Sequence, residues 1–231
     1  IPKVGGLQLR IANVIEEGKY GGPQVRMVRV AAALQKNLHT IIVLPSRNSE
    51  RFQQLCLEHQ IDYRTARLTP LSKDLLTAFN FFVFFLWETI KLLVLLKREN
   101  IHLVHASGGS WQYKAVLASW LLGVPCVWHL NDTKMPALIR FTFKHVQNLA
   151  QGWIFASNAS HDYYKNLITP GRPTAIIPST VDTDVFAPDT TVNSDPCVGK
   201  KGPFIGTVAN ISPVKGLETL IRACAALAEL G

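Results

Sequence analysis

Cysteine is scarce in this sequence, and its arrangement argues against a disulfide-stapled secreted domain. The four cysteines are Cys56, Cys126, Cys197 and Cys224. They are scattered, form no Cys-x-x-Cys pair and suggest no disulfide framework. We therefore predict reduced thiols, which are typical of a cytoplasmic protein.

Signals of secretion, metal binding and nucleic-acid binding are also missing. Residues 1–6 lead into no long apolar stretch of the kind found in signal peptides. The seven histidines show no His-Glu-x-x-His spacing. The sequence has neither a dense Lys/Arg run nor an RNP-type aromatic motif, so nucleic acid is the least favoured partner.

The overall charge nevertheless implies an anionic partner. Lys and Arg number 24 against 16 Asp and Glu, for a net charge of +8. An anionic membrane surface and phosphorylated substrates both fit this balance. The apolar content of 48% is ample for a packed core.

Short apolar runs alternate with amphipathic segments along most of the chain. Strands are predicted at residues 9–15, 40–44, 61–66, 101–106, 125–130, 152–156 and 174–177. Helices are predicted after Gly22 and at 51–60, 75–96, 111–122, 141–150 and 160–167. This alternation predicts an α/β fold, with a doubly wound parallel sheet covered by helices on both faces.

Polar or glycine-rich segments follow several of the predicted strands. They are Gly21-Gly22, Ser107–Ser110, His129–Asp132 and Ser157-Asn158. Ligands of open α/β sheets bind beyond the carboxyl ends of the strands. We therefore expect these segments to share one ligand-binding edge.

Residues 75–96 form a phenylalanine-rich apolar segment that is nearly long enough to span a bilayer. Thr77, Asn80, Glu88 and Lys91 interrupt it. The main expectation is a helix mostly packed on the sheet. Partial exposure for membrane docking and a true membrane span are the two alternatives.

The end of the sequence reads as a strand feeding a helix. Ser212 fits an N-cap, Pro213 fits the first helical position, and Lys215 follows in the first turn. The helix dipole disfavours a cation there, so Lys215 beside free N–H groups suggests a bound anion such as phosphate. Polar residues 189–201 read as a linker. We expect domains at 1–201 and 202–231, the second one truncated.

Four segments in this order resemble one enzyme family. They are Leu103–Ala106, Gly123–His129, the Pro-x-x-Val-Asp-x-x-x-Phe pattern ending at Phe186, and Gly206–Gly216. Together they resemble the family 4 (group 1) glycosyltransferases of GT-B fold. The resemblance implies a Rossmann-like N-terminal domain followed by the start of a donor-binding domain. It also implies sugar transfer from a nucleotide-sugar with retention of configuration, and no metal or other cofactor.

The resemblance also implies residue roles. Gly21 and Gly22 match the glycine loop under the donor phosphate, where glycine permits close approach and positive φ. His129 matches the histidine near the reacting sugar. Lys215 matches the cation that holds the leaving diphosphate. Asn210 stands where the family usually has a second cation, an arginine. The family's Glu-x7-Glu donor segment would lie beyond Gly231.

Each of these residues also has a purely structural interpretation. Gly21-Gly22 fits a tight turn, His129 a satisfied strand-end histidine, and Lys215 a solvated lysine. Ser107 and Ser110 fit either a helix N-cap or an anion or acceptor site. His105 and Asp182 are expected to be structural. Arg26 and Arg29 are expected on a solvated helix face, with contact to an acidic or lipid-phosphate acceptor as the alternative.

Three functions compete at this level. The first is a glycosyltransferase of envelope glycan biosynthesis, acting on a glycan or lipid-linked acceptor in the cytoplasm or at the inner membrane face. The second is a non-catalytic sugar- or nucleotide-binding module. The third is a partner of anionic membrane surfaces. The 231-residue chain alone is expected to be inactive, and its terminal strand and helix are expected to pack on the first domain, swap between chains or be disordered.

Overall fold

The chain divides into two compact units, which are described separately. A computed structural model describes residues 3–4, 7–71, 74–179, 181, 183–184, 186–187, 205–209, 211 and 215–229. The first unit is Ile1–Thr180 and the second is Val181–Gly231.

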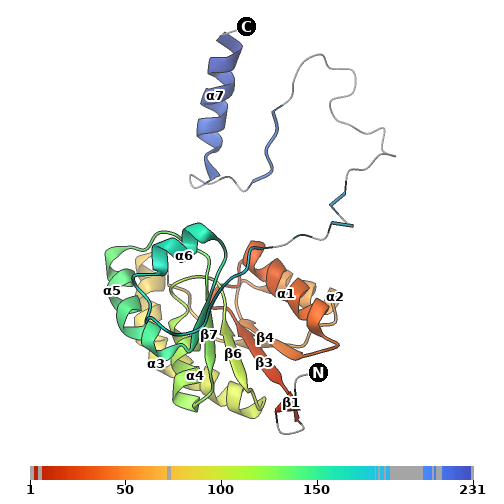
Figure 1. Cartoon of the computed structure of the whole chain (residues 1–231), viewed down its shortest axis with the longest axis vertical. Helices are drawn as coiled ribbons and strands as arrows, with labels where there is room; N and C mark the ends of the chain where they lie inside the picture. The colour runs from red at the N-terminus through yellow and green to blue at the C-terminus, as the bar shows by residue number, and fades with distance from the viewer. Residues whose placement is uncertain are drawn as a thin grey trace. The chain divides into compact units, whose positions relative to one another are not determined.

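A seven-stranded parallel sheet forms the centre of the first unit (Figure 1). In spatial order its strands are β5 (Tyr63–Ala66), β4 (His39–Pro45), β3 (Arg10–Val14), β6 (Leu103–Ala106), β7 (Cys126–Leu130), β8 (Gly152–Phe155) and β9 (Thr174–Ile176). A separate antiparallel pair, β1 (Lys3–Val4) and β2 (Leu7–Gln8), precedes it. The predicted Rossmann-like α/β fold is confirmed.

Helices cover both faces of the sheet, as the alternating apolar strands require. Ile42 and Leu44 of β4 pack on one face with the helices α1 and α2, and Ile41 and Val43 pack on the other with α3–α6 (Figure 1). The helices are α1 (Gly22–Leu34), α2 (Glu50–Glu58), α3 (Leu75–Arg98), α4 (Tyr113–Leu122), α5 (Ala137–Val146) and α6 (Asn158–Tyr164), with a 3-10 turn η1 (Gln147–Leu149) after α5.

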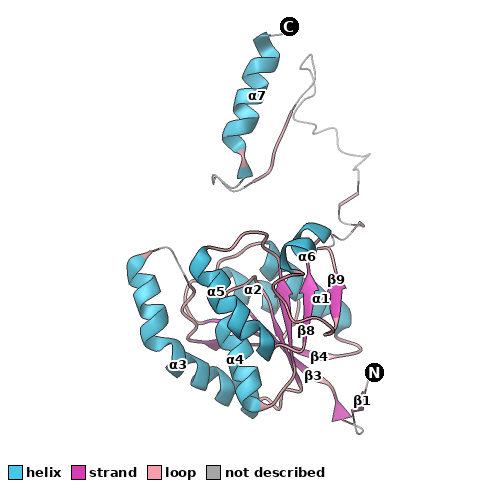
Figure 2. Cartoon of the chain, turned by 60° about the vertical axis from the view of Figure 1, so that its left-hand side comes forward, coloured by secondary structure: helices cyan, strands magenta, loops and turns pink. Residues whose placement is uncertain are grey.

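Helix α3 departs from the main expectation for residues 75–96. It packs chiefly on α4 rather than on the sheet, and Figure 2 shows the two helices side by side. One stripe that includes Phe81, Leu92 and Leu96 is buried, while Phe79, Leu86 and others remain exposed. The expectation that this helix is mostly packed is therefore wrong, because α4 covers only one side of α3 and leaves the other side exposed. Among the described residues, α3 is the one helix long and apolar enough to cross a membrane, and 28% of its most apolar window is buried.

The second unit contains one helix, α7 (Leu217–Glu229), among its described residues. The predicted helix at the end of the chain is confirmed. Residues 205–209 form no strand, contrary to expectation, because no strand among the described residues of this unit pairs with them. Ser212 and Pro213, the expected helix start, lie outside the described residues.

The order in which the chain adds strands to the sheet reverses between β3 and β6, which are parallel neighbours at the centre of the sheet. From β3 the chain adds β4 and β5 on one side, then returns to add β6 to β9 on the other. Such a switch point leaves a crevice at the carboxyl ends of the two strands, where ligands of this fold class bind.

Candidate functional site

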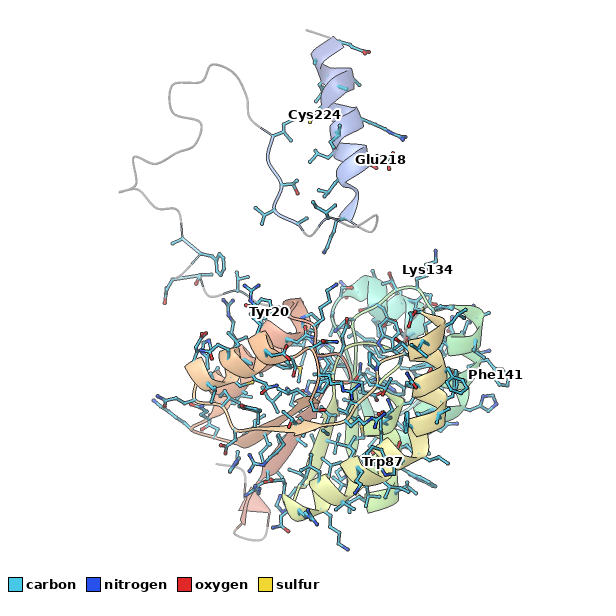
Figure 3. The ribbon with its side chains drawn as sticks, turned by 180° about the vertical axis from the view of Figure 1, so that it is seen from behind. Tyr20, Trp87, Lys134, Phe141, Glu218 and Cys224 are labelled. Atoms are coloured by element: carbon cyan, nitrogen blue, oxygen red, sulfur yellow. The ribbon has the colours of Figure 1, made fainter. Side chains whose placement is uncertain are left out.

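The loops that follow β3, β6, β7 and β8 lie on one edge of the sheet, as predicted. All four strands run parallel in register, so their carboxyl ends meet there. Tyr20 and Lys134, in the loops after β3 and β7, mark this edge along the upper side of the first unit in Figure 3. The candidate site is built from these loops and from the first turns of α1.

Arg26 on α1 crosses the switch point and joins three segments of this edge. Its Nη2 donates to Ser107 Oγ at 3.3 Å, and its Nη1 donates to Asn131 Oδ1 at 3.2 Å and Ser179 Oγ at 3.4 Å. Burial lowers the pKa of the guanidinium. Its partners among the described residues are all neutral, so none of them offsets its positive charge. The solvated face expected for Arg26 is wrong, because these long-range partners draw the side chain inward.

His129 lies at the end of β7, beside His105 at the end of β6. His105 Nε2 and His129 Nδ1 are 3.3 Å apart, and His129 is 3% exposed. Burial, followed by the charge of Arg26, lowers the pKa of His105 to about 4. Burial, Arg26 and then His105 lower the pKa of His129 to about 2. Both imidazoles are therefore neutral at physiological pH, and His129 Nε2 is buried without a partner within the described part of the chain.

The loop Ser107–Ser110 turns sharply between the two histidine-bearing strands. Gly108 and Gly109 have φ values of 115° and 118°, a region that favours glycine. A Cβ on Gly108 would lie 2.9 Å from Gln112 Nε2. Trp128 Nε1 donates to the Gly109 carbonyl at 2.8 Å. The turn is therefore built for close packing, and the N-cap of α4 is Gln112 rather than a serine of this loop.

Ser110 and Ser107 differ in their surroundings. Ser110 Oγ donates to Asp132 Oδ2 at 2.8 Å, and Tyr164 Oη donates to the other oxygen of the same carboxylate at 2.6 Å. This network ties the loops after β6 and β7 to α6, and it favours the structural alternative for Ser110. Ser107 instead accepts from Arg26 and belongs to the cationic part of the site.

Gly21 and Gly22 begin α1 at the rim of this edge. Gly21 is the N-cap with φ −170°, an extended conformation that any residue adopts. The positive φ that the resemblance implied is therefore absent. A Cβ on Gly22 would meet nothing within 4 Å. The structure thus leaves open space at Gly22, and close approach of a ligand is the remaining reason for glycine there.

A fully buried charge cluster supports the edge from behind. Lys114 Nζ lies 3.3 Å from Glu16 Oε2 and 3.1 Å from Glu88 Oε2. Glu16 Oε1 also accepts from the backbone N–H of Lys114 and Ala115 in the first turn of α4, where the helix dipole favours a carboxylate. Burial raises the pKa of Glu16. The cluster fixes the end of β3 against α3 and α4, and no short-range pattern in the sequence predicts it.

A polar pocket of about 380 Å³ opens beside the ends of β3, β4 and β5. Its described lining carries three cationic side chains and one acidic one: Lys19, Arg47, Arg67 and Glu17. Lys19 and Arg47 form no ion pair within the described residues. The pocket therefore favours an anionic group.

Several predicted residues lie apart from this site or outside the described residues. Lys215, just before α7, is exposed, and it belongs to the second unit. Asn210 and Asp182 lie outside the described residues. Within the part of the chain that the structure describes, no three His, Cys, Asp or Glu side chains group as metal ligands.

The comparisons with known proteins agree with this fold. A family model described as Glycosyltransferase Family 4 matches residues 20–185. Comparison with curated proteins finds no match. The structure is similar to that of Anabaena HepE in complex with UDP and glucose, with a TM-score of 0.61 and 16% identity over 78% of this chain and 46% of that one.

Two further solved structures share the architecture. A glycosyltransferase from Rickettsia africae has a TM-score of 0.60 and 15% identity, over 80% of this chain and 47% of that one. S. aureus MnaA with UDP has a TM-score of 0.57 and 14% identity, over 82% of this chain and 50% of that one. At such identities the likeness shows the fold alone. The chain spans about half the length of these proteins.

Proposed function

Because the chain belongs to glycosyltransferase family 4, we propose that it carries the acceptor-side half of an enzyme that transfers a sugar from a nucleotide-sugar with retention of configuration. The transfer needs no metal in this proposal. The 231-residue chain is proposed to be inactive without the remaining donor site. The similar structures of HepE and MnaA hold UDP, so UDP-sugars are the first donors to test.

The single observation that carries the proposal is Arg26, a cation at the switch point of the sheet whose partners among the described residues are all neutral. Negative charge builds on the leaving diphosphate as the bond to the sugar breaks. A fixed, partly buried guanidinium stabilises that charge without reorganisation. A bidentate fork also suits phosphate oxygens.

His129 supplies a neutral hydrogen-bonding group next to this charge. Its lowered pKa keeps the imidazole uncharged, so it binds a sugar hydroxyl rather than competing for the phosphate. Its Nε2 is buried and has no partner among the described residues, so a hydroxyl that enters beside it would satisfy this nitrogen. His105 holds the ring from the other side.

Lys215 is proposed to bind the donor diphosphate from the second unit. It precedes α7, where free N–H groups and the helix dipole add to its charge. Asn210 supplies a neutral contact in place of the usual arginine. Removing the Lys215 charge is expected to cost ~3 kcal/mol of transition-state stabilisation, or about a hundredfold in kcat/KM.

The protein is proposed to work in the cytoplasm, at the inner face of the membrane, in the assembly of an envelope glycan. The exposed apolar side of α3 supports this placement. Exposed cations lie on α3 and on the segment of α5: Lys91, Lys134, Arg140 and Lys144. Such a surface suits anionic lipid. In Figure 3, Trp87 of α3 and Phe141 of α5 lie at the outside of this helical layer.

The test uses the chain expressed together with the coding sequence that follows it. Release of UDP from a panel of UDP-sugars is measured with lipid and glycan extracts as acceptors. Arg26→Met and His129→Ala are each expected to lower kcat/KM at least a hundredfold. Lys36→Met, which removes an exposed cation just after α1, is the matched control and should retain full activity.

Three results would each overturn one part of this proposal. Turnover that is equal in Arg26→Met and the unmodified protein would remove Arg26 from the mechanism. Binding of UDP-sugars without any turnover would replace the transferase with a non-catalytic nucleotide-sugar-binding module. Turnover by the 231-residue chain alone would contradict the proposed inactivity of this half.

A further inference from the structure

Two pockets of opposite character are lined by neighbouring residues at the start of α3. Thr77 and Asn80 line the polar pocket described above, whereas Ala78 and Phe81 line an apolar groove. The loop before α3 divides in the same way, since Pro70 lines the polar pocket and the next residue, Leu71, lines the groove. One short stretch of chain therefore forms a wall of both.

The polar pocket carries its positive charge on a fixed frame. Arg67 lies 3.4 Å from Glu88 Oε1 through its Nε, and its guanidinium stacks over the Phe84 ring at 4.0 Å. Thr69 donates to the same carboxylate through its backbone N–H at 2.8 Å. Lys19 and Arg47, from the loops after β3 and β4, remain for a ligand. An anionic headgroup, and phosphate above all, fits this set.

The apolar groove has a volume of about 680 Å³ and lies between α3, α4 and α5. Its two hydroxyl groups are satisfied within the wall: Tyr113 Oη contacts Thr142 Oγ1 at 2.9 Å and the Ile139 carbonyl at 3.1 Å. Apolar side chains therefore make up most of the surface that a ligand meets. Phe82 and Leu138 line the groove and are 63% and 62% exposed, so it opens onto the outer surface.

We propose that the two pockets form one site for a single-chain lipid phosphate, which is the acceptor of the transferase. The phosphate lies among Lys19, Arg47 and Arg67, and the alkyl or prenyl chain lies in the groove beyond Phe81. The charge of one pocket and the apolar wall of the other are complementary to the two ends of such a molecule. The assignment as acceptor rests on the proposed function, whereas the binding site itself does not.

Binding is tested by calorimetry on the 231-residue chain with hexyl, octyl and decyl phosphate, each below its micelle concentration. Burial of each added methylene is expected to raise the affinity about threefold to fourfold. Inorganic phosphate, which lacks the chain, should bind more weakly than any of them. Equal affinities for hexyl and decyl phosphate would overturn the proposal.

Variants separate the groove from the general surface. Ala78→Trp fills the groove and should abolish the dependence on chain length, whereas Val83→Trp, on the exposed side of the same helix, should leave it unchanged. If Ala78→Trp is poorly folded by circular dichroism, Leu138→Gln at the exposed mouth serves instead and should reduce the gain per methylene. Identical behaviour of groove and control variants would contradict the site.

A second pair of variants tests the headgroup pocket. Lys19→Gln with Arg47→Gln should weaken decyl phosphate at least tenfold, and Lys36→Gln should have no effect. Binding to anionic vesicles alone, with no response to Ala78→Trp, would mean a membrane surface without a lipid site and would refute the proposal. Because no donor is used, these results are independent of transfer. If alkyl phosphates bind but the longer protein shows no turnover, the proposed enzyme activity is refuted and the lipid phosphate site is retained. If the longer protein shows turnover but alkyl phosphates do not bind, only the lipid phosphate site is refuted.

Discussion

His105 Nε2 and His129 Nδ1 lie 3.3 Å apart where β6 and β7 end, and neither imidazole is protonated at neutral pH. Their neutrality has a cause in the fold. Burial removes the hydration that a charged ring needs, and the guanidinium of Arg26 repels a second positive charge. This pair therefore links the site to the pH dependence of stability.

Acidification is expected to destabilise the protein through these two histidines. The unfolded state takes up protons near pH 6.5, whereas the folded state resists protonation until about pH 4 at His105 and about pH 2 at His129. The unfolded state thus binds more protons between pH 6.5 and 4. The stabilisation is complete above pH 6.5 and falls by ~1.4 kcal/mol per pH unit for each histidine as the pH drops through this window.

Urea unfolding between pH 7 and 5 checks this expectation. The double variant His105→Gln, His129→Gln should show a flatter dependence of the unfolding free energy on pH, whatever its stability at pH 7. Glu16, whose pKa burial raises, contributes a slope of opposite sign that is common to both proteins and cancels in the comparison. The exposed His145→Gln should keep the original slope. An unchanged slope in the double variant would show that the pair is protonated in the folded state.

The sequence was sufficient to predict the order of strands and helices around the parallel sheet and the edge on which the candidate site lies. Both depend on local patterns: apolar alternation along strands such as β4, and glycine or proline at the ends of elements. The C-cap of α4 at Gly123 has φ 74° and ends the helix where it was expected. The prediction of helix α5 was less accurate, because the helix begins at Ala137, directly after Pro136, rather than at Phe141.

The chemistry of the site depended on partners far apart in the sequence. Arg26 is 81 residues from Ser107 and 105 from Asn131, so no helical periodicity reveals that it turns inward. The exposed side of α3 was similarly hidden, because composition does not say whether one helix or a whole sheet covers an apolar segment. Sequence patterns predict which loops meet, but not which side chains within them form contacts.

The turn at Gly108 gives a prediction about stability. Gly108→Ala is expected to lower the unfolding free energy by ~1–3 kcal/mol, because φ 115° is nearly exclusive to glycine and the added Cβ would contact Gln112 and Ile15. Gly22→Ala is the matched control. It meets open space at the first position of a helix, so stability should be unchanged or higher by up to ~1 kcal/mol. Thermal and urea unfolding measure the stability of both variants. Equal losses of unfolding free energy in the two variants would show that a side chain at Gly108 does not strain the turn.

The Gly22→Ala variant also distinguishes the two interpretations of the Gly21-Gly22 loop, a donor-phosphate site and a tight turn. If Gly22 lies under a donor phosphate, Gly22→Ala should lower kcat/KM in the longer protein while its stability is retained. A tight turn without a ligand predicts full activity. Because the structure shows no backbone reason for glycine at this position, the activity measurement alone decides between them.

The buried cluster of Lys114 with Glu16 and Glu88 is expected to be essential for folding. Lys114→Met leaves two carboxylates, 1% and 0% exposed, without their shared cation. Loss of one partner of a buried charge group costs ~3–5 kcal/mol. The exposed pair Lys165–Asp162 is the control, and Lys165→Met should cost no more than ~1 kcal/mol. Urea midpoints measure the difference, which should shrink at low pH as Glu16, whose pKa burial raises, becomes protonated. Similar costs for the two variants would mean that water reaches the cluster.

The exposed side of α3 predicts binding to anionic membranes. Flotation with vesicles of phosphatidylglycerol and phosphatidylcholine should carry the 231-residue chain, and phosphatidylcholine alone should carry much less. Phe79→Ser with Leu86→Ser removes two side chains that are 64% and 68% exposed, and should lower the bound fraction at least tenfold. Leu57→Ser is the control, because Leu57 is 58% exposed on α2, which covers the opposite face of the sheet. Raised salt should weaken binding by screening the cations of α3 and α5. A bound fraction that responds equally to the α2 and α3 variants would assign the interaction to charge alone, and the apolar side of α3 would then be free for another partner.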